Sequence, residues 1–411
     1  MASSPAADLT AALSAVGART PSPRVVASGN AASPGALLAL VDGVLPAYRL
    51  FVLNAHPGIP DRDGVVHETA FVGPGMRRSG RLSYVPARLS LVPRLFETTL
   101  APDVVCLNVA PPVDGRLSLG TEVNILPAAI AECRRRGGLV LAQVNPSMPW
   151  TYGDSELALE DVDHLIEADE PLGEPVAVEP DDASRVVGER IAARVGDGAT
   201  LQMGIGMVPD AALPGLTHRR GLRVWSEMFS DGVLALDRAG ALDPGAELSS
   251  SFLYGSADLY AWVHRNERVR MLRTETTNSP AVIAGQRAMT SINTALQLDL
   301  FGQANASRIS ARIHSGFGGQ TDFIVGALHS PGGQALMALR SWHPKADVST
   351  IVPLVDEPVT SFQHTAVVTE QGVAEMFGHD ERSQAAQLID EVAHPRVREE
   401  LWEEAAALGL A

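Results

Sequence analysis

Residues 201–213 read LQMGIGMVPDAAL, a short apolar run followed by a glycine-rich turn and the start of a helix rich in Ala and Leu. Similar apolar runs recur along the chain and alternate with Ala-rich helical stretches; they read RLFVLNA, DVVCLNVA, LVLAQVN, LRVWSEM, QALMALR and TAVVTE. Buried strands that alternate with helices are typical of α/β units built around parallel sheets. We therefore predict an α/β fold of mostly parallel sheets with flanking helices.

The length of 411 residues favours two domains, because one hydrophobic core rarely supports so long a chain. Residues 172–182 (LGEPVAVEPDD) combine prolines with acidic residues and form the best linker. The stretches SGNAASPGALL (28–38) and MGIGMVPDAAL (203–213) each place a glycine five residues before a proline and then begin a helix. We predict two similar α/β domains, with limits at 1–24 for an N-terminal segment, 25–175 for the N-terminal domain and 176–411 for the C-terminal domain.

Composition narrows the classes of function. The net charge of −16 argues against a general affinity for nucleic acid or for an anionic membrane surface. The start of the chain lacks the pattern of a secretory signal, and no apolar run reaches the length of about 18 residues that a membrane span needs. Cys106 and Cys133 lie in apolar surroundings and offer no disulfide framework. We expect a cytoplasmic protein.

The glycine-rich turn within 201–211 is open to more than one interpretation. Backbone N–H groups at a helix start hold phosphate or a developing oxyanion, whereas the structural alternative is a tight turn between strand and helix. A dinucleotide-binding turn fits Gly204 and Gly206, with Glu227 about 20 residues further on as the ribose-binding acid. Pro209 stands at the third glycine position of that motif, however, and argues against it.

Other nucleotide, hydrolase and metal motifs are not found. A Walker A loop requires Gly-Lys followed by Ser or Thr, but Lys345 is the only lysine and it follows Pro344. There is no G-x-S-x-G nucleophile elbow, no H-E-x-x-H pair and no Cys-rich zinc pattern. We expect no metal site.

Two further stretches contain candidate chemistry. In HSGFGGQTDF (314–323), three glycines leave the backbone bare and polar side chains follow, although a loop that needs positive φ angles would look the same. In WSEMFSDG (225–232), Glu227 stands between Trp225 and Phe229 in an otherwise apolar stretch. A carboxylate in such surroundings calls for a functional explanation.

These stretches belong to a wider resemblance that covers about Val25 to Leu401. The matching segments read FVGPGMR, SYVPARLSLVPRLF, VNPSMPWTYGDS, LQMGIGMVPDAAL, SEMFSDGV, SINTALQLDLFGQANA, SGFGGQTDFIVGA and VVTEQGVAEMFG. Together they resemble the acetyl-CoA hydrolase/transferase family, whose members include 4-hydroxybutyrate, butyrate, acetate and succinate CoA-transferases. The resemblance implies two α/β domains of the CoA-transferase type.

The resemblance also implies a mechanism for Glu227, which stands at the glutamate of the family's [TS]-E-[ML]-x-[ST]-D-G stretch. In the family this glutamate attacks an acyl-CoA thioester and gives an acyl-glutamyl anhydride, which CoA thiolate converts to a glutamyl-CoA thioester. Such covalent catalysis predicts ping-pong kinetics. The glycine loop implies backbone N–H donors for the oxyanion, with Gly318 and Gly319 as the candidates.

The remaining site residues follow from the same resemblance. Coenzyme A is the expected cofactor, taken up as acyl-CoA, and its expected contacts are Gly204, Ile205, Gly206, Met207, Val208, Asn293, Gly302, Gly316 and Lys345. Arg77 and Gln320 are candidate contacts for a substrate carboxylate. The loop SWHPKADVST (341–350) departs from the family, because Trp342, His343 and Pro344 replace small residues.

The expected activity is transfer of CoA between small carboxylic acids, with acyl-CoA and carboxylates as partners and a homodimer as the assembly. Two alternatives remain open: hydrolysis of acyl-CoA through the same glutamate, and a non-catalytic CoA-binding protein. The acyl donor and acceptor are not readable from the sequence, since a methylene contributes only about 1–3 kcal/mol to discrimination in a pocket.

Overall fold

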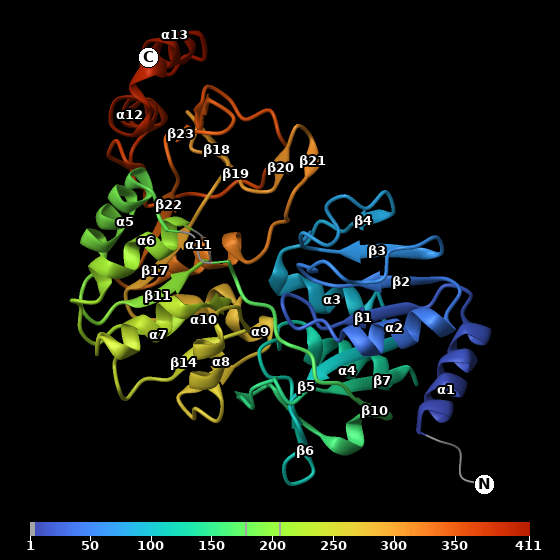
Figure 1. Ribbon diagram of the computed structural model, residues 1–411. Helices are drawn as coiled ribbons and strands as arrows, with labels where there is room; N and C mark the ends of the chain where they lie inside the picture. The colour runs from blue at the N-terminus through green and yellow to red at the C-terminus, as the bar shows by residue number, and fades with distance from the viewer. Residues whose placement is uncertain (1–4, 177–178, 205–206) are drawn as a thin grey trace. The chain divides into compact units, whose positions relative to one another are not determined.

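The structure is a computed structural model, and it describes residues 5–176, 179–204 and 207–411. The chain separates into two compact units (Figure 1). Unit 1 comprises Met1–Pro175, Ser249–Thr277 and His314–Gly318, and unit 2 comprises Val176–Leu248, Asn278–Ile313 and Gly319–Ala411. The first passage between the units therefore lies within the predicted linker, and two later segments of the chain return to unit 1.

Unit 1 is built on a seven-stranded sheet in which every neighbouring pair of strands is parallel. In sheet order the strands are β10 (His164–Glu167), β7 (Leu139–Val144), β5 (Val104–Val109), β1 (Arg24–Ala27), β2 (Tyr48–Phe51), β3 (Val65–Thr69) and β4 (Leu82–Tyr84). The helices that flank this sheet are α1 (Pro5–Arg19), α2 (Gly35–Val44), α3 (Val92–Glu97) and α4 (Leu126–Arg135).

The composition of the central strands explains their place in unit 1. All six residues of β5, VVCLNV, are buried, as expected for a strand covered on both faces. Phe51 at the end of β2 packs edge-on against Phe96 of α3, with ring centroids 5.4 Å apart. Cys106 and Cys133 are free thiols in this core, where they act as small apolar side chains.

Three strands of unit 1 are joined by a buried ion cluster. Glu68 of β3 is only 2% exposed and accepts hydrogen bonds from Arg24 Nε at 2.6 Å and from Arg49 Nη1 at 2.8 Å. Arg24 begins β1 and Arg49 lies in β2, so one carboxylate links three adjacent strands. A buried carboxylate with two cationic partners has its charge compensated and its hydrogen bonds satisfied.

Unit 1 also contains shorter elements outside the main sheet. β6 and β9 form an antiparallel pair and β8 pairs in parallel with β16. The shorter elements are β6 (Arg116–Ser118), β8 (Tyr152–Gly153), β9 (Glu156–Ala158), β15 (Phe252–Leu253), β16 (Val269–Met271), α8 (Ala257–Val263), α9 (Thr274–Thr277) and the 3₁₀ turns Leu89–Leu91 and Leu159–Asp161.

Unit 2 contributes six strands to a second sheet, and these pair in parallel with one another except that the strand at one end pairs antiparallel to its neighbour. In sheet order they are β27 (Val373–Glu375), β26 (Ala366–Val368), β22 (Gln334–Ala338), β17 (Met289–Asn293), β11 (Thr200–Met203) and β12 (Arg223–Trp225). The helices are α5 (Asp182–Arg194), α6 (Met207–Leu216), α7 (Asp231–Arg238), α10 (Pro280–Ala284), α11 (Gln320–His329), α12 (Glu381–Gln387) and α13 (Arg398–Ala407).

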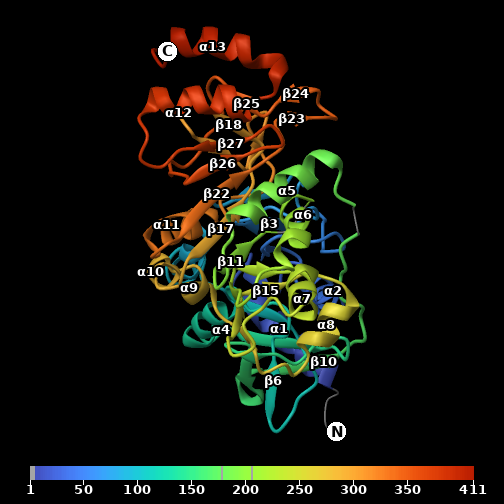
Figure 2. The ribbon, with the colours of Figure 1, turned by 90° about the vertical axis from the view of Figure 1, so that its left-hand side faces the viewer.

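Small strand pairs lie in the C-terminal part of unit 2. Figure 2 shows several of these strands together with α12 and α13, near the β26 and β27 end of the sheet. They are β18 (Gln297–Asp299) with β19 (Ala304–Asn305) and β25 (Ile351–Val352), β20 (Arg308–Ile309) with β21 (Arg312–Ile313), and β23 (Trp342–His343) with β24 (Val348–Ser349). A π-helical turn, Leu388–Val392, and a 3₁₀ turn, Pro395–Val397, connect α12 to α13.

The predicted fold class is confirmed: both units have mostly parallel sheets with flanking helices. Within the described part of the chain, no helix combines the length and the apolar character needed to cross a membrane. The same residues contain no group of three or more His, Cys, Asp or Glu side chains arranged to hold a metal ion.

Candidate active site

Glu227 lies at the carboxyl end of β12, two residues after the strand ends at Trp225. Ser226 fixes this corner, because its hydroxyl donates to the carbonyl of Met203, the last residue of the neighbouring strand β11. After Glu227 the chain forms β13 (Met228–Phe229) and then begins α7. In open α/β sheets, ligands bind beyond the carboxyl ends of the strands, and Glu227 lies at such an edge.

Two donors hold the Glu227 carboxylate within unit 2. Asn278 Nδ2 donates to Oε2 at 2.6 Å, and the backbone N–H of Gly319 donates to the same carboxylate. Gly319 has no side chain, and an added Cβ would overlap both Glu227 Oε2 and Asn278 Nδ2. Only glycine therefore permits this close approach of the backbone to the carboxylate.

The surroundings of Glu227 change its acidity. Burial raises the pKa of the carboxyl from its ordinary value to about 7, against the hydrogen bond from Asn278, which lowers it. The negative charge of Asp322 raises it further and the Gly319 N–H lowers it. Asp322 is itself buried in the first turn of α11, and Gly319 is the N-cap of the same helix. Strongly shifted carboxyl groups with a specific set of partners are candidates for catalysis.

Predicted CoA contacts follow the same edge of the unit 2 sheet. Gly204 comes directly after β11, and Asn293 ends β17, the parallel neighbour of β11. Asn293 Nδ2 donates to Ser291 Oγ at 2.7 Å, and this hydroxyl donates to Gln202 Oε1 of β11 at 2.7 Å. Gly204 and Asn293, both predicted as CoA contacts, therefore lie at the ends of adjacent strands.

The other residues of the glycine turn are described only in part. Ile205 and Gly206 lie outside the described residues, and Met207 and Val208 begin α6. Gln320, predicted as a substrate contact, begins α11, and its Nε2 donates to the carbonyl of Thr294 at 3.1 Å. This hydrogen bond ties the start of α11 to the chain just beyond β17.

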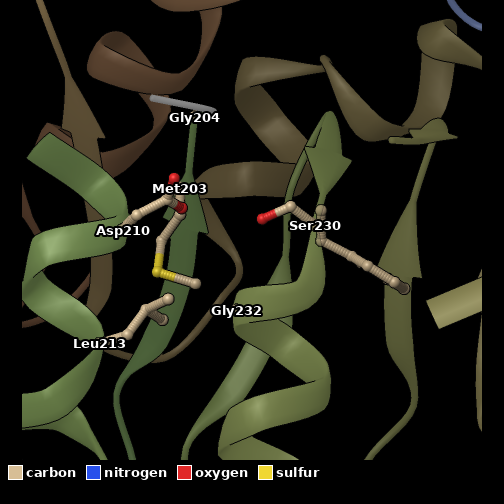
Figure 3. Close-up of a pocket in the computed structure, with 7 residues that line it drawn as sticks. Met203, Gly204, Asp210, Leu213, Ser230 and Gly232 are labelled. Atoms are coloured by element: carbon tan, nitrogen blue, oxygen red, sulfur yellow. The ribbon is translucent and has the colours of Figure 1, made fainter. Parts of the chain in front are cut away.

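A small pocket opens beside the glycine turn (Figure 3). Its lining residues are Met203, Gly204, Asp210, Leu213, Phe229, Ser230 and Gly232. Ser230 faces Met203 and Asp210 across it in Figure 3, so the pocket joins the turn after β11 to the segment that carries Glu227. Its volume of ≈ 10 Å³ has room for about one water molecule. Burial and the charge of Asp231 raise the pKa of Asp210.

Gly302 and Lys345 lie on other elements of unit 2. Gly302 has a φ of +72°, and its carbonyl lies 3.1 Å from Nε2 of the buried His364. An added Cβ on Gly302 would approach the methyl group of Met376. Lys345 lies between β23 and β24 in an exposed turn.

Three predicted residues belong to unit 1. Arg77 Nε donates to the carbonyl of His314 at 2.9 Å. Gly316 forms a single antiparallel bridge with Phe71, and Gly318 has a φ of +55° and accepts a hydrogen bond from the N–H of Leu89 at 2.9 Å. The bare backbone of this loop is therefore used for close packing and for a left-handed turn, as the structural alternative requires.

Sequence reasoning missed one partner of Glu227 and the effect of another. Asn278 lies two residues before Pro280, where a local pattern reads as the approach to a helix. Its contact with Glu227 spans 51 positions of the chain, which no local signal reveals. Asp322 was visible as a polar residue of the glycine loop, but its influence on the Glu227 pKa depends on the tertiary fold.

Comparisons with known proteins agree with this arrangement. Residues 55–178 match the acetyl-CoA hydrolase/transferase N-terminal domain, and residues 255–405 match the C-terminal domain. A 4-hydroxybutyrate coenzyme A transferase of Clostridium kluyveri is 39% identical over 354 residues, which cover 82% of this chain and 81% of that protein. Other relatives are named as CoA transferases and as acetyl-CoA hydrolases.

Solved structures give the same result. The crystal structure of RipA from Yersinia pestis matches with a TM-score of 0.88 at 25% identity and covers 97% of each chain. A 4-hydroxybutyrate CoA-transferase from Porphyromonas gingivalis matches with a TM-score of 0.79 at 29% identity, over 99% of this chain and 97% of that one. On the family domains, the relatives and these folds, the chain belongs to the acetyl-CoA hydrolase/transferase family.

Proposed function

We propose that the protein is a CoA-transferase that moves CoA between small carboxylic acids, with Glu227 as the covalent nucleophile. The observation that carries the proposal is the Glu227 carboxylate itself: its pKa is raised to about 7, and Asn278 Nδ2 and the Gly319 N–H hold it at the carboxyl end of β12. Membership of a family that contains named CoA-transferases supports it.

The proposed reaction begins when a Glu227 oxygen attacks the thioester carbonyl of acyl-CoA. The new C–O bond and the broken C–S bond leave an acyl-glutamyl anhydride and CoA thiolate. The thiolate then attacks the glutamyl carbonyl, which releases the first acid and leaves a glutamyl-CoA thioester. An acceptor carboxylate reverses these steps and takes the CoA away. Dividing the exchange into covalent steps predicts ping-pong kinetics.

Each tetrahedral intermediate in this sequence needs hydrogen-bond donors for its oxyanion. We assign this role to the backbone N–H groups of Gly318 and Gly319, with the Asn278 amide as a positioning donor for the glutamate. The N-terminus of α11 begins beside Gly319 and adds its partial positive charge. Losing one such donor typically costs about 10²–10³ in rate.

The remaining contacts of the proposed function concern CoA and the acid. The glycine turn from Gly204 to Val208, with Asn293, Gly302 and Gly316, lines the path of the CoA arm, and Lys345 meets its phosphates. Arg77 and Gln320 bind the acceptor carboxylate. We further propose a cytoplasmic homodimer that uses no metal. The acyl groups are left unassigned, because short acids differ by small increments of binding energy.

Hydrolysis is the second candidate, since relatives in the same family are named acetyl-CoA hydrolases. In that case water resolves the glutamyl intermediate. One assay separates the two activities: acetyl-CoA is incubated with and without a second carboxylate while free thiol is followed. Exchange without net thiol supports transfer, whereas thiol release that ignores the acceptor supports hydrolysis.

The nucleophile is tested with Glu227→Gln, which keeps the shape of the side chain but removes its charge. We expect CoA exchange to fall on the order of 10⁴-fold, as for other covalent nucleophiles. Glu189→Gln, an exposed position on α5, is the matched control and should keep full activity. Borohydride added after acyl-CoA should reduce Glu227 in the wild type alone. A Glu227→Gln protein with full turnover would exclude the mechanism.

A further inference from the structure

The sheet of unit 1 reverses its strand order at one place. The connection that follows β1 leads to β2 on one side, whereas β5, the neighbour of β1 on the other side, is followed by β7 further out. Ligands of open α/β sheets bind at such a switch point, beyond the carboxyl ends of the strands. In unit 2 the corresponding switch point lies between β11 and β17, whose ends carry the predicted CoA contacts Gly204 and Asn293. The switch point of unit 1 is therefore a second place where a ligand is expected.

Three polar side chains are hydrogen-bonded in series at this switch point, and we call them the polar relay: Glu122, Asn30 and Asn54. Asn30 comes shortly after β1, and Asn54 shortly after β2. Asn30 Nδ2 donates to Glu122 Oε2 at 2.5 Å, and Asn54 Nδ2 donates to Asn30 Oδ1 at 2.9 Å. Glu122 and Asn30 are only 1% and 3% exposed, whereas Asn54 is half-buried. The relay therefore extends from the core of unit 1 to a partly exposed position.

The backbone holds both asparagines of the relay in place. Their φ angles are +49° for Asn30 and +46° for Asn54, in the left-handed region that asparagine tolerates better than most residues. The N–H of Asn30 donates to the Leu53 carbonyl at 3.0 Å. The N–H of Asn54 donates to the Phe71 carbonyl at 2.8 Å. An added Cβ on Gly73 would overlap the backbone of Asn54, so the chain is closely packed there.

The carboxyl group at the buried end determines the direction of each amide. A carboxylate only accepts hydrogen bonds, whereas an amide donates at one end and accepts at the other. Because Asn30 turns its Nδ2 toward Glu122, its Oδ1 faces away and accepts from Asn54. Asn54 is left with its Oδ1, which accepts no hydrogen bond from the residues that the structure describes. The outer end of the relay is therefore a hydrogen-bond acceptor.

A second acceptor without a partner lies on the other side of the switch point. Asn108 belongs to β5 and is 3% exposed, and its Oδ1 has no hydrogen-bond partner within the described part of the chain. Its N–H donates to the hydroxyl of Ser28, just after β1, at 3.1 Å. A buried acceptor without a partner is unfavourable, and a ligand that donates to it removes this cost. Both sides of the switch point thus present acceptor oxygens.

We propose that this switch point is the specificity site for the acid that receives CoA, and that Asn54 Oδ1 accepts a hydrogen bond from a hydroxyl group of that acid. Glu122 and Asn30 are positioning residues, because they fix the direction of the Asn54 amide. A second carboxylate on the acid would bring only further acceptors and a negative charge, so dicarboxylates are disfavoured. This inference rests on the proposed function and adds the class of acid, which is a short hydroxy acid.

The wild-type protein is tested first, with acetyl-CoA as the donor and four-carbon acids as acceptors. The acceptors are butyrate, 3-hydroxybutyrate, 4-hydroxybutyrate and succinate. We expect at least one hydroxybutyrate to exceed butyrate in kcat/KM about 3–10-fold, the contribution of one hydrogen bond, and succinate to be the poorest acceptor. A preference for succinate, or equal use of butyrate and both hydroxybutyrates, would overturn the inference.

Glu122→Gln tests the direction of the relay. Glutamine can turn either its oxygen or its NH₂ group toward Asn30, so the relay can reverse and Asn54 can then present Nδ2, a donor. The kcat/KM for succinate relative to the hydroxybutyrates should rise about 3–10-fold. Glu132→Gln is the matched control, because Glu132 is another buried carboxylate of unit 1, 6% exposed and paired with Arg135. It should leave this ratio unchanged.

Asn54→Gly removes the outer amide, and glycine adopts the positive φ of this position without strain. The hydroxybutyrates should lose their advantage over butyrate, with no gain for succinate. Asp114→Gly is the control, since Asp114 also has a positive φ, of +50°, but lies in an exposed turn. A packing defect would change the use of all acids alike, whereas the two relay variants should differ in their effect on succinate.

The outcomes distinguish this inference from the proposed function. If CoA exchange is normal but the ratios between acids are the same in the wild type and in both relay variants, the inference fails and the CoA-transferase remains. If Glu122→Gln and Glu132→Gln change the succinate ratio equally, the relay does not set specificity. If the wild type exchanges CoA with none of the acids, the proposed function fails and the inference falls with it.

Discussion

Glu68 in unit 1 and Glu227 in unit 2 are both carboxylates removed from solvent. Glu68 forms ion pairs with two arginines, whereas Glu227 accepts a hydrogen bond from the neutral Asn278 side chain. Glu68 meets two cations; burial alone would raise its pKa, yet the hydrogen bonds and charges of Arg24 and Arg49 outweigh that effect and hold the pKa below its usual value. For Glu227, burial raises the pKa to about 7, and the Asn278 side-chain amide and the Gly319 backbone N–H donate to the carboxylate.

The difference indicates how the partners of a buried carboxylate suit it to stabilising the fold or to reacting with a substrate. The charges of Arg24 and Arg49 compensate the charge of Glu68. Both oxygens of this carboxylate are used in the ion cluster that joins β1, β2 and β3. Amide groups donate to Glu227, and under the proposed function this carboxylate serves as the nucleophile. Four predictions test this comparison, in order of decreasing effect.

After loss of the nucleophile itself, the largest effect is expected from Gly319→Ala. The new Cβ would overlap Glu227 Oε2 and Asn278 Nδ2, so the carboxylate must leave its position. The rate of CoA exchange should fall on the order of 10²–10³-fold, as for loss of an oxyanion donor. Initial-rate assays measure this. Gly43→Ala on α2, where an added Cβ meets open space, is the control and should keep the rate. Normal exchange by Gly319→Ala would remove the special status of this glycine.

Glu68→Gln should lower the free energy of unfolding by about 3 kcal/mol at neutral pH, because it leaves the largely buried Arg24 without its charge partner. The folded protein should keep its specific activity. Since the folded pKa of Glu68 is lowered, the loss should be present above the ordinary glutamate pKa and disappear as pH falls through the folded pKa. Urea unfolding across this range measures it.

The control for Glu68→Gln is Glu97→Gln, which breaks an exposed Arg94–Glu97 pair of 2.6 Å in the same unit. Such a pair contributes about 0–1 kcal/mol. Equal destabilisation by the two variants would mean that burial does not determine how much these ion pairs contribute to the free energy of unfolding.

Glu227→Gln should stabilise the protein by about 1–3 kcal/mol at pH 8 while abolishing activity. The folded pKa of about 7 lies above the unfolded value of 4.5, so the native state loses stability as the group deprotonates between these values and bears the full cost above pH 7. The gain should vanish below pH 4.5. Urea unfolding of this variant and of the control Glu189→Gln at several pH values tests whether the gain in stability appears at high pH. A gain that appeared only at low pH would contradict the raised pKa of Glu227.

The smallest effect concerns the pH profile. In the wild type, kcat/KM should rise with pH through about 7, because the carboxylate is the nucleophile. Asp322→Asn removes a charge that raises the Glu227 pKa, so this limb should move to lower pH, by less than about one unit. Asn278→Ala removes a donor that lowers the pKa and should move the limb the other way. Shifts of the same sign in both variants would contradict the assigned causes.

Local sequence patterns predicted the sheets well, because a buried parallel strand is a continuous apolar run. The stretch RLFVLNA covers β2 except its first residue, Tyr48. DVVCLNVA and LVLAQVN contain β5 and β7, and LRVWSEM, QALMALR and TAVVTE contain β12, β22 and β26. Strand order is not local information. β1 lies between β2 and β5, which come from distant parts of the sequence.

The site was predictable where a motif carries it and not where the tertiary fold does. Glu227 and Gly319 stand in recognisable stretches, and the structure brings them into contact. Asn278 has no motif. The ring contacts of Trp342 with His394 and Arg396 likewise join segments that no spacing rule connects. The assignments of Gly302, Gly316, Gly318, Lys345 and Arg77 stay predictions.

The division of the chain also affects how the protein is made. Unit 1 is completed by residues 249–277 and 314–318, which leave the ribosome long after its first 175 residues. The N-terminal part of unit 1 therefore lacks these two segments until residue 318 has been synthesised, in contrast to domains that fold one after another as they emerge. Neither unit can be cut out of the gene as one uninterrupted piece.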